Sequence, residues 1–293
     1  MADAPIQATL YADPACPWGY SAVPALRVVD WRYGDQIDWR LVMIGLADDP
    51  SVYADRGFTP TWMAQAHVSF RRYGMPFATH VKERIASTGL GCRAVIAARL
   101  ASPGDEWRVL RGLQLANFTT SLLADDPEQL AAAVRAIPGI DAETILAQVD
   151  TPEVAAAYEH DKDEARSAVG SPTELQGKAA TAGDGRVRYT APSVVFTRGD
   201  LKLEAGGFQP AEAYDVVIAN LDPSLRRADA PETPLPLLER FADGLTTQEV
   251  TALMTRGNDA PDRDAARRAL LELVGSGAAT ATPLGDDALW RAA

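Results

Sequence analysis

The chain has two cysteines, Cys16 and Cys92, and the first of them stands where a sulfur could react. Cys16 directly precedes Pro17, and proline is favoured at the first position of a helix. The free N–H groups and the dipole at a helix N-terminus favour thiolate over thiol. Cysteines placed in this way can have a pKa of about 3.5–7.5. The sequence therefore predicts that Cys16 is a nucleophile with a lowered pKa, the alternative being a small buried cysteine that only packs.

The elements that would position Cys16 follow from the hydrophobic pattern. Residues 6–12 form a short apolar run that predicts a strand. Apolar residues recur at helical spacing over 17–33, and residues 37–44 predict a second strand. A strand–helix–strand opening implies that the two strands are parallel. Strand patterns return at 187–196 and 201–205, followed by a helix expected at about 210–221.

Between these two halves the pattern is helical almost throughout, from about residue 50 to residue 170. Gly, Pro and Asp separate the candidate helices at the expected places. The candidate helices are 61–74, 80–88, 92–101, 106–123, 127–137, 142–149 and 152–169. A helical block of more than a hundred residues is therefore expected between two halves of one sheet.

The last quarter of the chain, from residue 222, has its own turn and helix-capping signals. A polar, proline-rich stretch at 222–236 indicates a linker. Thr246 and Glu249 form a capping-box pattern, and Asp262 can cap a second helix. A hairpin is expected around 283–287, so the outline is helix, helix, hairpin, which is typical of a winged-helix module.

A DNA-binding role for this tail is disfavoured by its charge. Residues 231–293 hold six Arg and ten Asp or Glu, and a net-negative module suits phosphate contacts poorly. One short basic stripe, Arg263, Arg267 and Arg268, is the exception. An intramolecular lid or a dimerisation element, which would make a homodimer, is the preferred interpretation.

The composition limits the function classes further. The chain has 293 residues, 47% of them hydrophobic and 23% charged, which is typical of a globular protein with a sizeable core. Its formal net charge of −12 argues against general affinity for nucleic acid or anionic membrane. No signal peptide or membrane span is evident, and two cysteines make no disulfide framework, so a cytoplasmic protein with reduced thiols is expected. The three histidines show no metal-ligand spacing, and no metal is expected.

Residues 13–20, Asp-Pro-Ala-Cys-Pro-Trp-Gly-Tyr, resemble the D-P-x-C-P-W-C-Y segment of cytoplasmic DsbA-like oxidoreductases of the FrnE-type group. The resemblance covers residues 6–221 and implies a thioredoxin-like fold. It maps the attacking cysteine of that family onto Cys16. It also implies an active-site loop that contains Pro14, Pro17, Trp18 and Gly19.

A second landmark is Thr190-Ala191-Pro192, which stands before a strand pattern. It resembles the cis-proline loop that faces the thiol in thioredoxin-like proteins. The resemblance implies a cis peptide at Pro192 and a substrate-binding role for Thr190, Ala191 and Pro192. The alternative is an ordinary trans proline that opens a strand.

The chain departs from the family pattern at Gly19, where the resolving cysteine is expected. Without it, Cys16 could form a mixed disulfide but would need an external thiol to release it. Glutathione or mycothiol could serve, with no permanently bound cofactor. Cys92 is the internal candidate for a resolving thiol, and its alternative role is packing.

The resemblance implies a cytosolic monothiol thiol–disulfide oxidoreductase that acts on small, peptide or protein disulfides. Two alternatives remain: a transferase or isomerase of the kappa-class type that uses glutathione or mycothiol, and a non-catalytic thioredoxin-fold binding protein. The implied organisation is a thioredoxin-like domain at 1–48 and 183–222, an inserted helical domain at 49–182, and a winged-helix-like module at 232–293.

Overall fold

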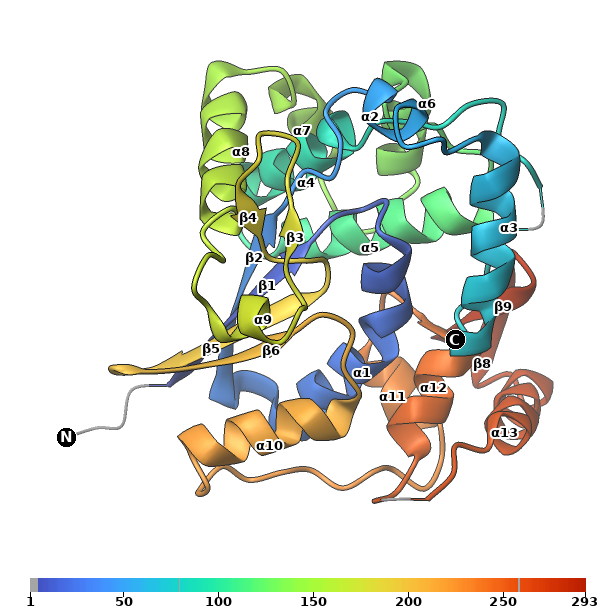
Figure 1. The fold of residues 1–293 in the computed structure, drawn as a ribbon. Coiled ribbons are helices and arrows are strands. Elements are labelled where there is room, and N and C mark those ends of the chain that lie inside the picture. The colour runs from blue at the N-terminus through green and yellow to red at the C-terminus, as the bar shows by residue number, and fades with distance from the viewer. Residues whose placement is uncertain (1–4, 79, 258) are drawn as a thin grey trace.

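The computed structural model describes residues 5–78, 80–257 and 259–293. At its centre is a four-stranded sheet in the order β2-β1-β5-β6 (Figure 1). Strand β1 (Ile6–Ala12) is parallel to β2 (Ile37–Met43) and antiparallel to β5 (Ser193–Arg198), which is antiparallel to β6 (Leu201–Gly206). The helix α1 (Pro17–Tyr33) joins β1 to β2. The predicted strand–helix–strand unit is confirmed. The other two strands of the sheet, β5 and β6, come from a segment that begins about 150 residues after β2.

Helices fill the segment between the two halves of the sheet, and Figure 1 shows α4 to α8 gathered above it. Helix α4 packs against α5, α7 and α8, and α8 also packs on β2. The helices of this segment are α2 (Ser51–Ala54), α3 (Pro60–Phe70), α4 (Gly89–Ala101), α5 (Asp105–Thr119), α6 (Pro127–Arg135), α7 (Ala142–Gln148), α8 (Pro152–Ala165) and α9 (Pro172–Leu175). The mixed α/β architecture expected from the sequence is present.

One predicted helix, over residues 80–88, is wrong: this stretch is irregular up to the start of α4. The ammonium of Lys82 donates to Asn117 Oδ1 and to the Leu122 carbonyl. The backbone N–H of Ser87 donates to Asp125 Oδ2. These bonds to α5 and to the loop after it hold the segment extended, and tertiary contacts thereby override its helical propensity.

The strand pattern at 187–196 corresponds to two separate strands in the structure. The short β4 (Val187–Arg188) pairs with β3 (Ala180–Thr181), and β5 begins only at Ser193. Pro192 has no N–H to give to a ladder, and the N–H of Tyr189 donates to the Ala165 carbonyl in α8. After β6, helix α10 (Ala211–Leu221) packs on α1, β5 and β6.

The C-terminal elements are α11 (Leu235–Arg240), β7 (Leu245–Thr246), α12 (Thr247–Met254), α13 (Arg263–Gly275), β8 (Ala279–Leu284) and β9 (Asp287–Ala292). Their sheet has the order β7-β9-β8. The Thr246–Glu249 capping box and the Asp262 cap are present as predicted, and β8 and β9 form the expected hairpin. The sequence did not reveal α11. The winged-helix interpretation and the domain limits stay predictions.

Buried charges attach these C-terminal elements to the rest of the molecule. The guanidinium of Arg111, in α5, holds both carboxylate oxygens of Glu249, at 2.6 and 2.9 Å. Its Nε lies 2.8 Å from Asp243, which also pairs with Arg27 of α1. Both Arg111 and Glu249 are buried, and Arg111 holds the pKa of Glu249 below its usual range against the effect of burial. Breaking such a buried pair costs about 3–5 kcal/mol.

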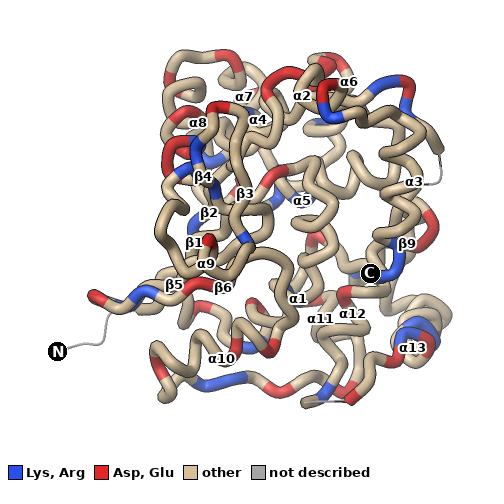
Figure 2. The backbone as a smooth tube through the Cα atoms, viewed as in Figure 1, with Lys and Arg blue, Asp and Glu red and all other residues tan. Residues whose placement is uncertain are grey.

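Positively and negatively charged residues are mixed along the chain, including on α13 (Figure 2). Arg263 of the predicted basic stripe pairs with Asp287 at 2.7 Å, so it is not free to meet a phosphate. Among the described residues, no helix combines the length and the apolar character needed to cross a bilayer.

Candidate active site

Cys16 lies where the chain passes from β1 into α1. The backbone N–H of Cys16 donates to the Asp13 carbonyl at 3.2 Å, which closes a tight turn over Pro14 and Ala15. Cys16 has extended backbone angles and is the N-cap of α1, with Pro17 at the first helical position. The predicted helix start is therefore confirmed. The turn and the proline together aim the cysteine side chain past the open end of the helix.

The thiol meets the loop that contains Pro192. Cys16 Sγ donates to the carbonyl oxygen of Ala191 at 3.0 Å, although the two residues are 175 positions apart. The Ala191–Pro192 peptide bond is cis, as expected from the sequence. Cys16 and Ala191 are both buried, with 6% and 5% of their surfaces exposed. The structure thus brings together the two landmarks that the sequence presents separately.

The expected lowering of the Cys16 pKa is not found. Burial raises the pKa of the thiol to about 11, and this is the largest effect. The backbone N–H groups of Gly19 and Trp18 lower the pKa and the Asp13 carboxylate raises it, while Arg188 lowers it. The helix end favours the thiolate, but the loss of water around the sulfur outweighs it. In this conformation Cys16 is a protonated thiol at neutral pH.

Gly19 leaves open the space that a second active-site cysteine would use. A Cβ atom built on Gly19 would lie 3.6 Å from the Cys16 Cβ, 3.8 Å from Gln114 Nε2 and 3.9 Å from the Ala191 Cβ. Disulfide-bonded cysteines have Cβ atoms about 3.5–4.5 Å apart. The distance between the two Cβ positions therefore falls within the range of a disulfide, although position 19 carries no sulfur.

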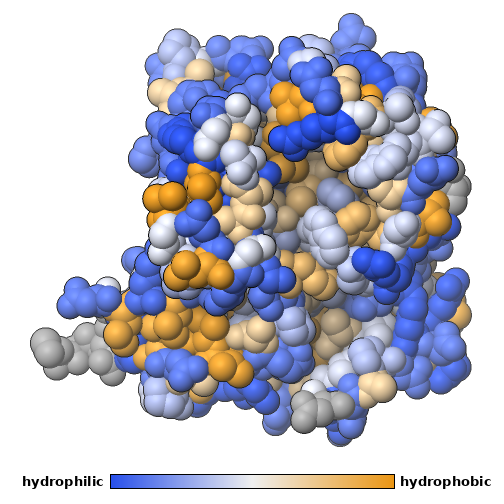
Figure 3. Space-filling view, in the orientation of Figure 1, coloured by the Kyte–Doolittle hydropathy of each residue, from blue (hydrophilic) through white to orange (hydrophobic). Residues whose placement is uncertain are grey.

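Aromatic side chains surround the outer side of the site. Trp18 is 40% exposed and contacts Phe70, Tyr73 and Phe208, with ring centroids 4.8, 5.5 and 5.6 Å away. We call these four residues the aromatic cluster. Figure 3 shows a recess in the middle of the face that carries α1 and the loops around it. An apolar part of a substrate could pack against this cluster.

Two other predicted loop residues have structural contacts. Pro14 is buried, and a Cβ on Gly91 would lie 3.3 Å from its Cγ, so the turn packs tightly on α4. The hydroxyl of Thr190 donates to the Lys178 carbonyl at 2.8 Å. The Thr190 side chain therefore fixes the loop, and a substrate contact from it stays a prediction.

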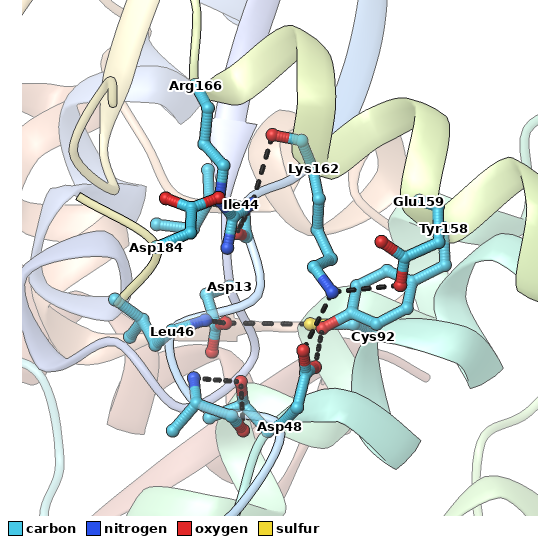
Figure 4. Close-up of polar contacts among 12 residues, drawn as sticks. Asp13, Ile44, Leu46, Asp48, Cys92, Tyr158, Glu159, Lys162, Arg166 and Asp184 are labelled. Carbon is cyan, nitrogen blue, oxygen red and sulfur yellow. Dashed lines mark hydrogen bonds and ion pairs between the residues drawn. The ribbon is translucent and has the colours of Figure 1, made fainter. Parts of the chain in front are cut away.

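Cys92 faces a buried carboxylate, as Figure 4 shows. Its Sγ donates to Asp13 Oδ2 at 3.5 Å, while Asp13 also accepts from the N–H groups of Leu46 and Ala15, both at 2.9 Å. Burial raises the pKa of Cys92 well above its usual value, and the negative charge of Asp13 adds to this. Both cysteines are free thiols. A resolving role for Cys92 stays a prediction, and its contact with Asp13 does not favour it.

A second polar cluster anchors the neighbouring loop. The hydroxyl of Tyr158 and the ammonium of Lys162, both in α8, donate to Asp48 at 2.6 and 2.7 Å (Figure 4). These bonds hold the loop that follows β2. The Asp13 turn lies against the same loop through Leu46.

A small pocket opens beside Ala15, next to Cys16, and it is lined by His67, His80 and Lys82 among others. Burial lowers the pKa of His67 to about 4 and that of Lys82 to about 8. His67 is therefore neutral at physiological pH. Within residues 5–78, 80–257 and 259–293, no three His, Cys, Asp or Glu side chains are grouped to hold a metal ion.

Three residues near the thiol were missed by sequence reasoning: Asp13, Gln114 and Arg188. Asp13 belongs to the same motif as Cys16, and a buried acid could have been suspected from that position. Arg188 precedes the cis-proline loop, and Gln114 lies in the middle of α5. Neither has a spacing relative to Cys16 that a sequence pattern could reveal.

No family model matches the chain, and no curated protein matches it. Solved structures do. The cytosolic disulfide reductase DsbM from Pseudomonas aeruginosa is 16% identical with a TM-score of 0.52, over 74% of this chain and 100% of that one. Its structure with GSH is 17% identical with a TM-score of 0.50, over 73% and 98%.

A probable DsbA oxidoreductase from Streptomyces coelicolor is 17% identical with a TM-score of 0.54, over 77% of this chain and 94% of that one. These similarities show that the chain has a DsbA-like, thioredoxin-like fold. About a quarter of this chain lies outside each of these matches.

Proposed function

We propose that the chain is a monothiol thiol–disulfide oxidoreductase, in which Cys16 forms a mixed disulfide that an external low-molecular-weight thiol resolves. One observation carries the proposal: Cys16, at the start of α1, has its Sγ 3.0 Å from the carbonyl oxygen of Ala191. The position of the second sulfur, at Gly19, is open. The DsbA-like fold supports the same reaction class.

In the first step, a disulfide R–S–S–R′ approaches the cis-proline loop. A backbone N–H of the substrate takes over the Ala191 carbonyl, and Cys16 Sγ turns toward the N–H groups of Trp18 and Gly19. The thiol releases its proton to water, and the thiolate attacks one substrate sulfur. The Cys16–S–S–R bond forms while the R–S–S–R′ bond breaks, and the leaving R′S⁻ takes up a proton.

In the second step, an external thiol R″SH loses its proton and attacks the sulfur of R. The Cys16–S–S–R bond breaks, R–S–S–R″ leaves, and the Cys16 thiolate is reprotonated. The net change is exchange of R′SH for R″SH in the disulfide, so the protein itself is neither oxidised nor reduced. No second cysteine is required.

The substrate class follows from the surroundings of the thiol. The aromatic cluster offers an apolar surface beside Cys16, which suits a peptide or protein disulfide. Glutathione or mycothiol is the proposed resolving thiol, and GSH is bound in the DsbM structure of similar fold. Because both reagents are cytoplasmic, we place the reaction in the cytoplasm.

The proposal is tested by incubating the reduced protein with glutathione disulfide and mapping the adduct by mass spectrometry. We expect one glutathione on Cys16, removed when reduced glutathione is added. The Cys16→Ser variant should take none, and the Cys92→Ser variant should behave as the wild type. An intact protein that takes no adduct on Cys16 at any pH up to 9 would rule the proposal out.

A second candidate is a non-catalytic thioredoxin-fold binding protein. The observation that favours it is the raised pKa of the buried Cys16 thiol. In that case Cys16→Ser would bind the same protein partners as the wild type, and no thiol exchange would be detected.

A further inference from the structure

A second cavity lies behind the active-site helix, and the proposed reaction does not use it. It has a volume of about 440 Å³ and is bounded by β1, α1, α5 and the segment Arg240–Asp243, which begins at the last residue of α11. Ligand sites in proteins typically measure about 300–1,000 Å³. The cavity is therefore large enough for a two-ring organic molecule.

The walls of the cavity are mainly apolar and aromatic. Trp39 and Trp107 contact each other edge to face with their centroids 6.4 Å apart, and both line the cavity. Leu10, Leu26 and Leu110 are among the other lining residues. Flat aromatic walls favour a flat, apolar ligand.

One end of the cavity approaches the residues around Cys16. Gly19 and Pro192 line the cavity, and the missing side chain of Gly19 leaves space 3.6 Å from the Cys16 Cβ. A larger residue at position 19 would occupy that space. A ligand that fills the cavity would therefore contact Gly19 and Pro192, the neighbours of Cys16.

One polar side chain at the end near Cys16 has no partner. Gln114 is only 4% exposed and lines the cavity. Its Nε2 lies 3.8 Å from the position of a Gly19 Cβ, so the amide points toward the open space. Among the described residues, no hydrogen bond reaches this amide. The amide is therefore free to hydrogen-bond with a polar group that enters the cavity.

The lining of the cavity includes four arginines and two aspartates, Asp30 and Asp243. Arg27, Arg111 and Arg240 are each paired with a carboxylate. Arg108 is exposed and donates only to the Gly139 carbonyl, and within the described part of the chain no carboxylate pairs with it. In a protein with a net charge of −12, an unpaired arginine at a cavity mouth favours an anionic group there.

We propose that this cavity is a binding site for a small aromatic anion. The apolar rings lie between Trp39, Trp107 and Phe241, a hydrogen-bonding group meets Gln114 beside Cys16, and the anionic group meets Arg108. The C-terminal segment Arg240–Asp243 supplies one wall, which assigns that part of the chain a role in ligand binding. The site is non-covalent and involves no electron transfer.

The probe for this site is anilinonaphthalene sulfonate, an aromatic anion whose fluorescence rises in apolar surroundings. We expect saturable binding to a single site and at least about ten-fold weaker binding to Leu26→Trp, which fills the cavity. Leu225→Trp, a matched change at a half-buried leucine that does not line the cavity, should bind as the wild type does. Circular dichroism checks that both variants are folded.

Two further measurements do not depend on a core substitution. The neutral analogue N-phenyl-naphthylamine should bind several-fold more weakly than the anion, and Arg108→Gln should remove this difference, whereas Arg135→Gln on exposed α6 should not. Saturating probe should also slow alkylation of Cys16 by iodoacetamide several-fold. Equal binding of the anion to Leu26→Trp and Leu225→Trp, no binding to the wild type, or unchanged alkylation of Cys16 would overturn the proposal. No disulfide is used, so the outcome is independent of the proposed exchange reaction.

Discussion

The N-terminal ends of α1 and α4 each hold one of the two cysteines, and the surroundings of the two sulfurs differ. Cys16 caps α1 and donates to the neutral carbonyl of Ala191, with the N–H groups of Trp18 and Gly19 close enough to lower its pKa. Cys92 lies inside α4 and donates to the carboxylate of Asp13. Burial raises the pKa of both thiols. Backbone N–H groups lower the pKa of Cys16, whereas the Asp13 carboxylate raises the pKa of Cys92 further. A position near a helix N-terminus is therefore not enough to make a thiol reactive, because the groups that contact the sulfur also set its pKa.

The largest expected effect tests the empty position beside Cys16. Gly19→Cys should form a disulfide with Cys16 on mild oxidation, since a Cβ at position 19 lies 3.6 Å from the Cys16 Cβ. Release of a mixed disulfide from Cys16 should become at least about a hundred-fold faster, because the second thiol acts intramolecularly.

Peptide mapping without reductant and rapid-quench kinetics measure these two effects. Gly19→Ser is the matched control, since it adds a side chain of similar size without a sulfur. If Gly19→Cys stays a dithiol under oxidising conditions, the arrangement of α1 described above is incorrect.

The next prediction compares the two cysteines directly. At pH 8 we expect iodoacetamide to label Cys16 at least about ten-fold faster than Cys92, because the thiolate is the reacting form and Asp13 disfavours it at Cys92. Quantitative mass spectrometry of the two peptides measures the ratio. Asp13→Asn should reduce the ratio of the two labelling rates, because it removes that negative charge. Equal labelling rates of Cys16 and Cys92 in the wild type would contradict the expected difference between the two thiols.

Both raised pKa values make stability depend on pH. Above about pH 8.5 the unfolded chain loses its thiol protons while the native protein keeps them. The unfolded state then binds fewer protons, and the free energy of unfolding falls by up to about 1.4 kcal/mol per pH unit for each thiol. Cys92→Ser and Cys16→Ser should each flatten this decline between pH 8 and 9.5. Urea unfolding at several pH values measures the slope, and parallel slopes in all three proteins would refute the assignment.

The smallest expected effect concerns Arg188, whose positive charge lowers the pKa of Cys16. Arg188→Gln should raise that pKa and slow alkylation of Cys16 a few-fold, with no change at Cys92. Arg186→Gln is the control, since Arg186 is exposed and pairs with Asp163 and Asp184. The pH profile of alkylation separates a pKa change from a change in access, and an identical profile in both variants would remove Arg188 from the site.

Local patterns predicted much of the fold. The bounds of β1 and α1 agree with the structure, because each has an unbroken apolar period and a clear stop. The Thr246–Glu249 capping box also forms as predicted. The segment 80–88 fails, because Lys82 and Ser87 bond to groups more than thirty residues away. A helical period cannot reveal such partners.

The sequence also predicted some features of the active site and missed others. The sequence placed Cys16 at a helix start and expected a cis peptide at Pro192, and both features are present. It did not anticipate that the thiol would be buried against Ala191 or that its pKa would rise to about 11. Desolvation depends on every atom that surrounds the sulfur, and those atoms come from several segments of the chain.

By itself, the sequence determined the order of the strands β1, β2, β5 and β6, the helix that starts at Pro17, and the absence of a sulfur at position 19. These are local properties, set by residue type and by spacing along the chain. Only the tertiary structure decided that Cys16 meets Ala191, that Cys92 meets Asp13, and that a cavity opens behind α1. Such contacts join residues from 79 to 175 positions apart, and packing in three dimensions alone sets their distances and their exclusion of water.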